Sequence, residues 1–105
     1  MLVSGKEILQ KAHKEGYAVG AFNTNNLEST KAMIQAAEEE RSPIIIQTSQ
    51  SAISYAGLEE IAMIVRMLAE KASVPVALHL DHGTDWDVVM QCLRYGWTSV
   101  MFDGS

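Results

Sequence analysis

The sequence carries an apolar run over residues 75–83 that ends in two imidazoles and a carboxylate. These side chains are His79, Asp81 and His82, and Gly83 follows them directly. Imidazole nitrogens are common ligands of zinc, and a carboxylate held beside such an ion can carry a proton to or from a substrate oxygen. A buried strand that delivers these groups at its carboxyl end therefore predicts metal-assisted proton transfer.

The histidines of the sequence are expected to differ in role. His13 lies among charged residues of a polar segment and is interpreted as solvated surface. His79 lies two residues before Asp81, so the two side chains share a face of the strand, and a packed structural role for His79 is at least as well supported as direct chemistry. His82 has the opposite parity and stands where the strand gives way to a loop. Because His79 and His82 point apart in a regular strand, we do not expect them to bind one metal together, and His82 is the better ligand candidate.

A catalytic zinc site requires about three protein ligands and an open position. The sequence offers His82, with Asp103 at the end of the next strand as a possible secondary ligand or orienting partner. That set is one or two ligands short of a site. Asp81 is expected to move a proton beside the metal, although an aspartate after a strand can equally cap a turn or a helix.

Two further polar positions could contact a substrate. Ser49, followed by Gln50 and Ser51, could hold a phosphate with hydroxyl and backbone N–H groups, which is a weak signal by itself. Asn23 follows another apolar run and could donate to a substrate oxygen, although asparagine is equally at home in a turn.

The elements that position these residues follow from hydrophobic periodicity and capping residues. The Ser4-x-x-Glu7 capping box begins a helix that presents Ile8, Leu9 and Ala12 and runs to Gly16. Further helices are expected over residues 27–41, 57–72 and 84–96, with Asn25 or Asn26 and Thr84 or Asp85 as N-caps, and with Val89, Cys92 and Leu93 facing inward. Strands are expected at residues 17–23, 43–49, 75–83 and 99–103.

Strands that are apolar throughout and are joined by helices indicate an α/β fold with a parallel sheet covered by helices. Polar residues follow every predicted strand, so they should meet on one rim of the sheet. A (β/α)8 TIM barrel takes about 250 residues. The sequence, with an N-terminal helix and about four strands, therefore predicts an N-terminal half barrel, and residues 1–105 are interpreted as a single incomplete domain.

Composition narrows the class of protein. Apolar residues make up 48% of the 105 residues and charged residues 20%, which favours a folded core over disorder. The net charge of −5, without a basic cluster, argues against a nucleic-acid or anionic-membrane partner. The single cysteine, Cys92, fits a reducing compartment, and no apolar run approaches the length of about 18 residues that a membrane span requires. We expect a soluble, cytoplasmic protein.

Covalent catalysis through a Schiff base needs a lysine at a strand end or inside the barrel. The lysines of this sequence all lie on or beside predicted helices: Lys6, Lys11, Lys14, Lys31 and Lys71. Nothing resembles a P-loop, a dinucleotide-binding fingerprint or a nucleophile elbow. These residues therefore favour metal chemistry over Schiff-base chemistry.

The whole chain resembles the start of class II, metal-dependent fructose-bisphosphate aldolases and their tagatose-bisphosphate relatives. The resemblance is carried by four motifs: Gly-Tyr-Ala-Val-Gly-Ala-Phe-Asn (16–23), Ala-Ala-Glu-Glu-Glu-Arg-Ser-Pro (36–43), His-Leu-Asp-His-Gly (79–83) and Ser-Val-Met-Phe-Asp-Gly-Ser (99–105). The third is specific for the family, and the ensemble more so.

The resemblance implies a role for each candidate residue. His82 would be a zinc ligand, Asp81 the catalytic acid/base, and Asp103 a residue near the metal. Asn23 would contact the substrate and Ser49 would help bind a substrate phosphate. The zinc would polarise the ketose carbonyl and stabilise the enediolate of dihydroxyacetone phosphate as the central carbon–carbon bond breaks or forms.

The activity implied is the reversible, zinc-dependent cleavage of fructose 1,6-bisphosphate to dihydroxyacetone phosphate and glyceraldehyde 3-phosphate, a glycolytic and gluconeogenic step, in a homo-oligomer. The residues leave the choice between fructose and tagatose bisphosphate open. In that family the other zinc-binding histidines and a Gly-rich phosphate loop lie beyond the stretch matched here, so the 105-residue chain alone is expected to be inactive. The alternative is an inactive half barrel that self-associates or pairs with another chain. A phosphate-binding barrel with other chemistry is a weaker reading, given His-x-Asp-His-Gly at strand three.

Overall fold

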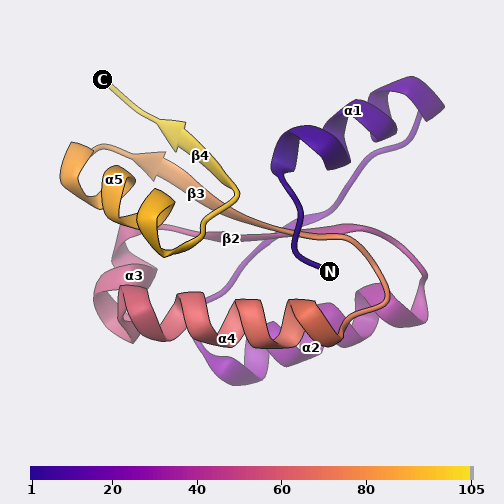
Figure 1. The fold of residues 1–105 in the computed structure, drawn as a ribbon, viewed down its shortest axis with the longest axis horizontal. Helices are drawn as coiled ribbons and strands as arrows, with labels where there is room; N and C mark the ends of the chain where they lie inside the picture. The colour runs from indigo at the N-terminus through magenta and orange to yellow at the C-terminus, as the bar shows by residue number, and fades with distance from the viewer. Residues whose placement is uncertain (105) are drawn as a thin grey trace.

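The computed structural model describes residues 1–104, which form helices packed against a parallel sheet (Figure 1). In chain order the elements are α1 (Gly5–Glu15), β1 (Ala21–Asn23), α2 (Leu27–Glu39), β2 (Ile44–Thr48), α3 (Gln50–Ala56), α4 (Leu58–Lys71), β3 (Val76–Gly83), α5 (Trp86–Tyr95) and β4 (Ser99–Phe102). No helix within these residues is long and apolar enough to cross a membrane. The predicted order of helices and strands is confirmed, with the short helix α3 added to it.

Within residues 1–104 the sheet has the strand order β1-β2-β3-β4, and every neighbouring pair is parallel. Helices α2, α4 and α5 contribute side chains to one continuous core with the buried face of the sheet. Helix α1 instead lies against β3, and its first residue, Gly5, packs closely on Ser99. Helices α2, α4 and α5 therefore cover one face of the sheet, and polar strand residues lie on the other face.

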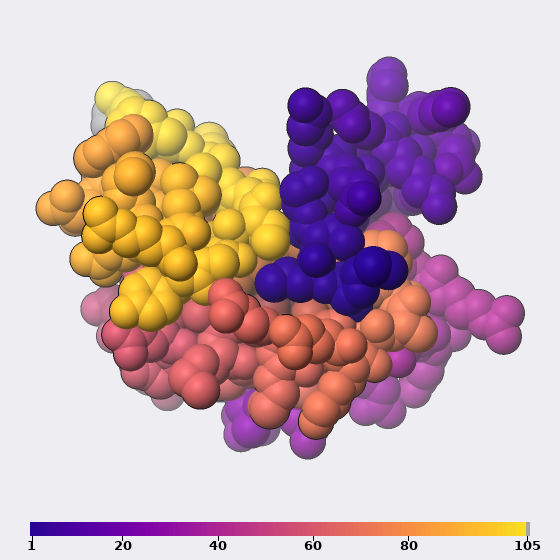
Figure 2. Space-filling model, viewed as in Figure 1, coloured from indigo at the N-terminus to yellow at the C-terminus, as the bar shows by residue number. Residues whose placement is uncertain are grey.

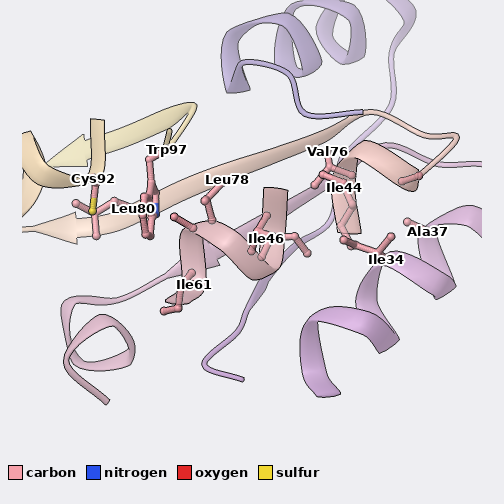
Figure 3. Packing of buried hydrophobic residues seen from close by; sticks show 14 of the residues in the cluster. Ile34, Ala37, Ile44, Ile46, Ile61, Val76, Leu78, Leu80, Cys92 and Trp97 are labelled. Carbon is pink, nitrogen blue, oxygen red and sulfur yellow. The ribbon is translucent and has the colours of Figure 1, made fainter. Parts of the chain in front are cut away.

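Alternation along the two central strands creates the core (Figure 3). Ile44, Ile46 and Thr48 are the buried positions of β2, and Leu78 and Leu80 are among those of β3. Because period-2 residues share a sheet face, these side chains meet the helices. Residues of the helices that complete the core include Ile34, Ile61, Val65, Val89 and Cys92. Truncating a fully buried residue such as Leu80 to alanine would cost about 2–5 kcal/mol.

The predicted capping residues begin and end the helices. Ser4 Oγ accepts the Glu7 N–H at 3.1 Å, Asn26 Oδ1 accepts the Ser29 N–H at 2.7 Å, and Asp85 Oδ1 accepts the Asp87 N–H at 2.9 Å. Each bond satisfies an amide that the first turn of a helix leaves unpaired. Helices α1 and α5 end at glycines in the left-handed conformation, as expected for a C-terminal cap.

Three details of the prediction are wrong. Strand β1 begins at Ala21 rather than residue 17, because only residues 21–23 pair with β2. Leu93 is 46% exposed instead of facing inward, and Leu9, expected on the same helix face as Ile8 and Ala12, is 52% exposed while they are buried. Helix α1 buries only a narrow stripe containing Ile8 and Ala12, and α5 is the outermost helix beside β4 among residues 1–104. Both helices therefore have less apolar contact than their sequence patterns suggested.

Both outer strands present an open edge within residues 1–104. Phe22 of β1 and Phe102 of β4 are 51% and 53% exposed, and Met101 is 41% exposed. Figure 2 shows α1 and the β4 end as two lobes with a notch between them. Unpaired strand edges with exposed apolar side chains are templates for pairing with another chain.

We expect the 105-residue chain to self-associate, because pairing would satisfy both open edges. Light scattering coupled to size-exclusion chromatography should give a mass above that of one 11.5 kDa chain. A charge at the β1 edge, introduced as Phe22→Lys, should lower the associated fraction. A well-ordered parent chain that stays monomeric at all concentrations would contradict this expectation.

The thiol of Cys92 should be unreactive in the folded chain. Cys92 is fully buried, and burial raises the pKa of its thiol to about 11. Its neutral form therefore contributes to stability below the ordinary thiol pKa of 9.0, and that contribution is lost as the pH rises through about 11. A thiol-reactive dye at mildly alkaline pH should label Cys92 only after denaturant is added; rapid labelling of the native chain would show that α5 does not pack as described.

Candidate functional site

A bulge in β3 places the acidic and imidazole side chains on the rim. Leu80 pairs with Val100 and Gly83 with Phe102, so Asp81 and His82 stand opposite the one residue of β4 between those pairs. His82 occupies the left-handed region, with φ of 49°. That conformation costs a non-glycine residue about 1–2 kcal/mol. A β-bulge of this kind, in which two residues of one strand oppose one residue of its neighbour, redirects side chains and is common next to active sites.

Gly83 makes the bulge possible. A Cβ added at this residue would lie 2.8 Å from Leu80 Cδ2 and 2.8 Å from Val89 Cγ2, so the position faces α5 at close range. Leu80 and Gly83 therefore both face the helices although they are three residues apart. The two residues between them are left for the other side of the strand and its rim.

The imidazole and carboxylate groups form a continuous series across β3 and β4. The Asp81 carboxylate lies 3.8 Å from His79 Nε2 through one oxygen and 3.8 Å from His82 Nε2 through the other. His82 Nδ1 lies 3.2 Å from Asp103 Oδ2, within hydrogen-bond distance. The expectation that His79 and His82 point apart is corrected here, because the bulge breaks the alternation and brings both rings to one carboxylate.

The His82 ring has the contacts of a metal ligand that a carboxylate orients. When Nδ1–H donates to Asp103, the lone pair of Nε2 is left for a ligand, and Asp81 lies beside it. The ring is 63% exposed, so a ligand can reach it. No group of three potential metal-binding side chains occurs within residues 1–104. The chemistry of His82, Asp81 and Asp103 fits part of a zinc site.

His79 belongs to a polar row that crosses the sheet. The strand register pairs Asn23 with Gln47, Gln47 with His79 and His79 with Ser99. His79 Nδ1 and Ser99 Oγ are 2.7 Å apart. Burial lowers the pKa of His79, and the neighbouring Asp81 carboxylate opposes that shift only in part. A partly buried, hydrogen-bonded ring agrees with the structural alternative for His79 and also holds it against the Asp81 carboxylate.

The two predicted substrate-contacting residues line one pocket. Asn23 and Ser49 share a hollow of about 420 Å³ with Thr24, Ser51 and Tyr55. Asp81 and His82 are not among the described residues that line it. The structure therefore brings the predicted residues together as two adjacent groups, one at the ends of β1 and β2 and one at the ends of β3 and β4.

The structure shows the local contacts of Ser49 and Asp81. Ser49 is the N-cap of α3, where its Oγ accepts the Ala52 N–H at 3.1 Å. Its hydroxyl hydrogen has no acceptor among residues 1–104, so the group can still donate to a ligand. Asp85 rather than Asp81 caps α5, and Asp81 faces the imidazoles.

Gln47 and Ser99 were not singled out from the sequence, although Gln47 is a polar residue inside the apolar strand β2 and Ser99 is the polar first residue of β4. That interruption of a strand pattern was the available signal. Strand register, which the sequence does not give directly, is what shows that both belong to the same row as His79.

The parallel sheet, its helical layer and the polar rim have the architecture of the first half of a (β/α)8 barrel. The YdjI aldolase from Escherichia coli K12 has the same arrangement, with a TM-score of 0.93 and 32% sequence identity over 100% of this chain and 41% of that chain. The profile of the family described as fructose-bisphosphate aldolase class-II matches residues 3–105. The chain belongs to the class II fructose-bisphosphate aldolase family.

Curated relatives agree with this family. A fructose-bisphosphate aldolase of Thermus caldophilus is 55% identical over 105 residues, which cover 100% of this chain and 34% of that protein. A sulfofructosephosphate aldolase of Alkalicoccus urumqiensis is 45% identical over 103 residues, covering 98% of this chain and 36% of that protein. The chain spans about a third of the length of these relatives.

Replacing Gly83 by alanine should destabilise the chain. The added Cβ would meet Leu80, Val89 and the Met101 carbonyl oxygen at 3.2 Å or less, and crowding of this kind costs about 1–3 kcal/mol. Gly104→Ala is the matched control, since its Cβ would meet the nearest described atom at an ordinary 3.7 Å. Denaturant unfolding at equal protein concentration should separate the two variants, and equal midpoints would show that the β3 bulge tolerates a side chain.

Proposed function

We propose that this chain supplies the acid/base, one zinc ligand and part of the substrate pocket of a class II ketose-bisphosphate aldolase. The reaction is the reversible cleavage of fructose 1,6-bisphosphate to dihydroxyacetone phosphate and glyceraldehyde 3-phosphate, a cytoplasmic step of glycolysis and gluconeogenesis. The observation that carries the proposal is the Asp81 carboxylate between two imidazoles, one of which is oriented by Asp103.

Asp81 is the proton carrier of the proposed reaction. Aldol cleavage requires a base to take the proton of the hydroxyl on the carbon that becomes the aldehyde, while the electrons of the broken carbon–carbon bond pass toward the ketose carbonyl. Asp81 is partly exposed on the rim and makes no helix-capping contact, so it can reach a substrate hydroxyl. His79, fixed by Ser99, holds one side of this carboxylate.

His82 is the zinc ligand that this chain contributes. Its Nε2 is the donor atom, Asp103 orients the ring through Nδ1, and further ligands are required for a catalytic site. A bound zinc ion would supply Lewis-acid polarisation of the substrate's carbonyl.

Asn23 and Ser49 are the substrate-contacting groups. Both line one pocket, where an amide and a hydroxyl can bind the oxygens of a phosphorylated ketose. Similarity over the same stretch to both a fructose-bisphosphate aldolase and a sulfofructosephosphate aldolase is consistent with leaving the choice of sugar open. The substrate class is therefore proposed as a phosphorylated ketose, with fructose 1,6-bisphosphate as the first to test.

A second candidate function is a half barrel that pairs with another chain. The open edges of β1 and β4 and their exposed apolar residues favour this candidate for the 105-residue chain taken alone. A homo-oligomer of the complete enzyme remains part of the main proposal.

A chimera tests the aldolase proposal. Residues 1–105 would replace the matching stretch of the Thermus caldophilus relative, which is 55% identical there. The parent chimera should cleave fructose 1,6-bisphosphate in a chelator-sensitive way. Asp81→Asn should lower kcat by about 10²–10⁴-fold, the usual contribution of a general acid or base. His82→Ala should lower the zinc content as well as the rate.

The matched control is His13→Ala, because His13 is exposed on α1 and outside the site. An Asp81→Asn chimera with the activity of the parent would contradict the proposed role. The 105-residue chain alone should show no cleavage, since its residues hold too few zinc ligands. Chelator-sensitive cleavage by that chain would contradict the expectation that residues 1–105 are inactive by themselves.

A further inference from the structure

The side chain of Gln50 connects two loops on the rim. Its Nε2 donates to Thr84 Oγ1 at 3.0 Å, and its Oε1 accepts the Asp85 N–H at 2.9 Å. These partners lie 34 and 35 residues away in the sequence. A carboxamide is suited to this position because it carries a donor and an acceptor on one rigid plane.

The connected loops carry the two parts of the candidate site. Gln50 directly follows Ser49 at the start of α3, and Ser49 lines the pocket that also contains Asn23. Thr84 directly follows the β3 bulge with Asp81 and His82. The amide of Gln50 therefore spans the boundary between the substrate pocket and the acid/base with its metal ligand.

The connection continues into β4. The Gly83 carbonyl oxygen, one residue before Thr84, accepts the Asp103 N–H at 3.0 Å. Asp103 in turn contacts His82. A second, buried connection lies below the rim, where Trp97 Nε1 donates to Thr48 Oγ1 at 3.1 Å. Two side-chain connections therefore join these segments: the Gln50 connection is exposed at the rim, and the Trp97–Thr48 connection is buried.

We propose that Gln50 is a positioning residue that fixes the separation between the Ser49 pocket and the Asp81–His82 bulge. Its catalytic consequence rests on the proposed aldolase function. The connection itself does not, because it is a property of the folded chain. A misplacement of about 1 Å between binding and reacting groups can lower a rate by about 10²-fold, so a fixed separation has kinetic value.

Residue-level hydrogen exchange on the 105-residue chain tests the connection. Gln50→Ala should speed exchange of the Asp85 amide, which loses its acceptor, and also of the Asp103 amide, which is reached only through the β3 loop. Thr84→Val should speed both to a smaller extent, and Thr84→Ser, which keeps the hydroxyl, should restore the parent rates. Gln91→Ala is the control, since Gln91 is exposed on α5 and makes no side-chain hydrogen bond within residues 1–104.

Faster exchange at Asp85 and Asp103, with core amides such as that of Leu80 unchanged, supports the positioning role. A change at Asp85 alone, or at neither residue, overturns it. If Gln50→Ala speeds exchange throughout the chain, Thr84→Val decides, because it removes one bond and leaves the Asp85 acceptor in place.

Steady-state kinetics of the chimera provide a second test of the positioning role of Gln50. Gln50→Ala should lower kcat/KM by between about tenfold and about a hundredfold relative to Gln91→Ala. Thr84→Ser should retain the activity that Thr84→Val loses. Equal kcat/KM values for Gln50→Ala and Gln91→Ala overturn the positioning role. An inactive parent chimera instead contradicts the proposed function, and the exchange result then decides the role of Gln50 by itself.

Discussion

Asp81 and His82 stand together opposite a single residue of β4, and the rim is arranged around that mismatch. The bulge places His82 in a left-handed conformation that an L-residue avoids in a regular strand. Close packing of Gly83 on Leu80 and Val89, together with the Asp103–Gly83 hydrogen bond, offsets that cost. Without the bulge, His82 would point toward the helical layer, and neither the Asp81 contact nor the Asp103 contact could form. The local conformation of β3 is thus what turns a strand end into a site.

The polar row on the same sheet explains how the carboxylate is held. Asn23, Gln47, His79 and Ser99 are register neighbours across the four strands of the described sheet. Polar groups placed toward a barrel interior need hydrogen-bond partners, because unpaired ones are costly away from water. His79 meets that need through Ser99 on one side and approaches Asp81 on the other. The row therefore gives the partly buried His79 ring a hydrogen-bond partner and also holds that ring beside Asp81, the proposed acid/base.

Much of this fold could be predicted from local patterns. Apolar runs and capping residues such as Ser4 and Asp85 are encoded within a few neighbouring residues, and the structure follows them. Helix α3 was not predicted because its seven residues are too few to show a helical periodicity. Ser49 was interpreted as part of a phosphate-binding loop rather than as a helix cap. The β3 bulge was not predicted because the alternation of side chains along a strand assumes regular pairing. The bulge depends instead on Gly83 fitting closely against α5. The roles of Asp81, His82, Asp103, Asn23 and Ser49 remain predictions that the geometry supports.

In the proposed reaction, the distribution of charge separates the metal-binding groups from the phosphate-binding groups. Asp81 and Asp103 both contact His82 on the rim, whereas every lysine and arginine of the sequence lies on a helix or, for Arg41, in the turn after α2. A rim rich in carboxylates attracts a divalent cation and disfavours a phosphate. In the proposed reaction a phosphate would meet neutral donors of this chain, the Ser49 hydroxyl and the Asn23 amide in their common pocket. The separation of that pocket from the carboxylates is then an electrostatic requirement, and a rigid connection such as Gln50 maintains it.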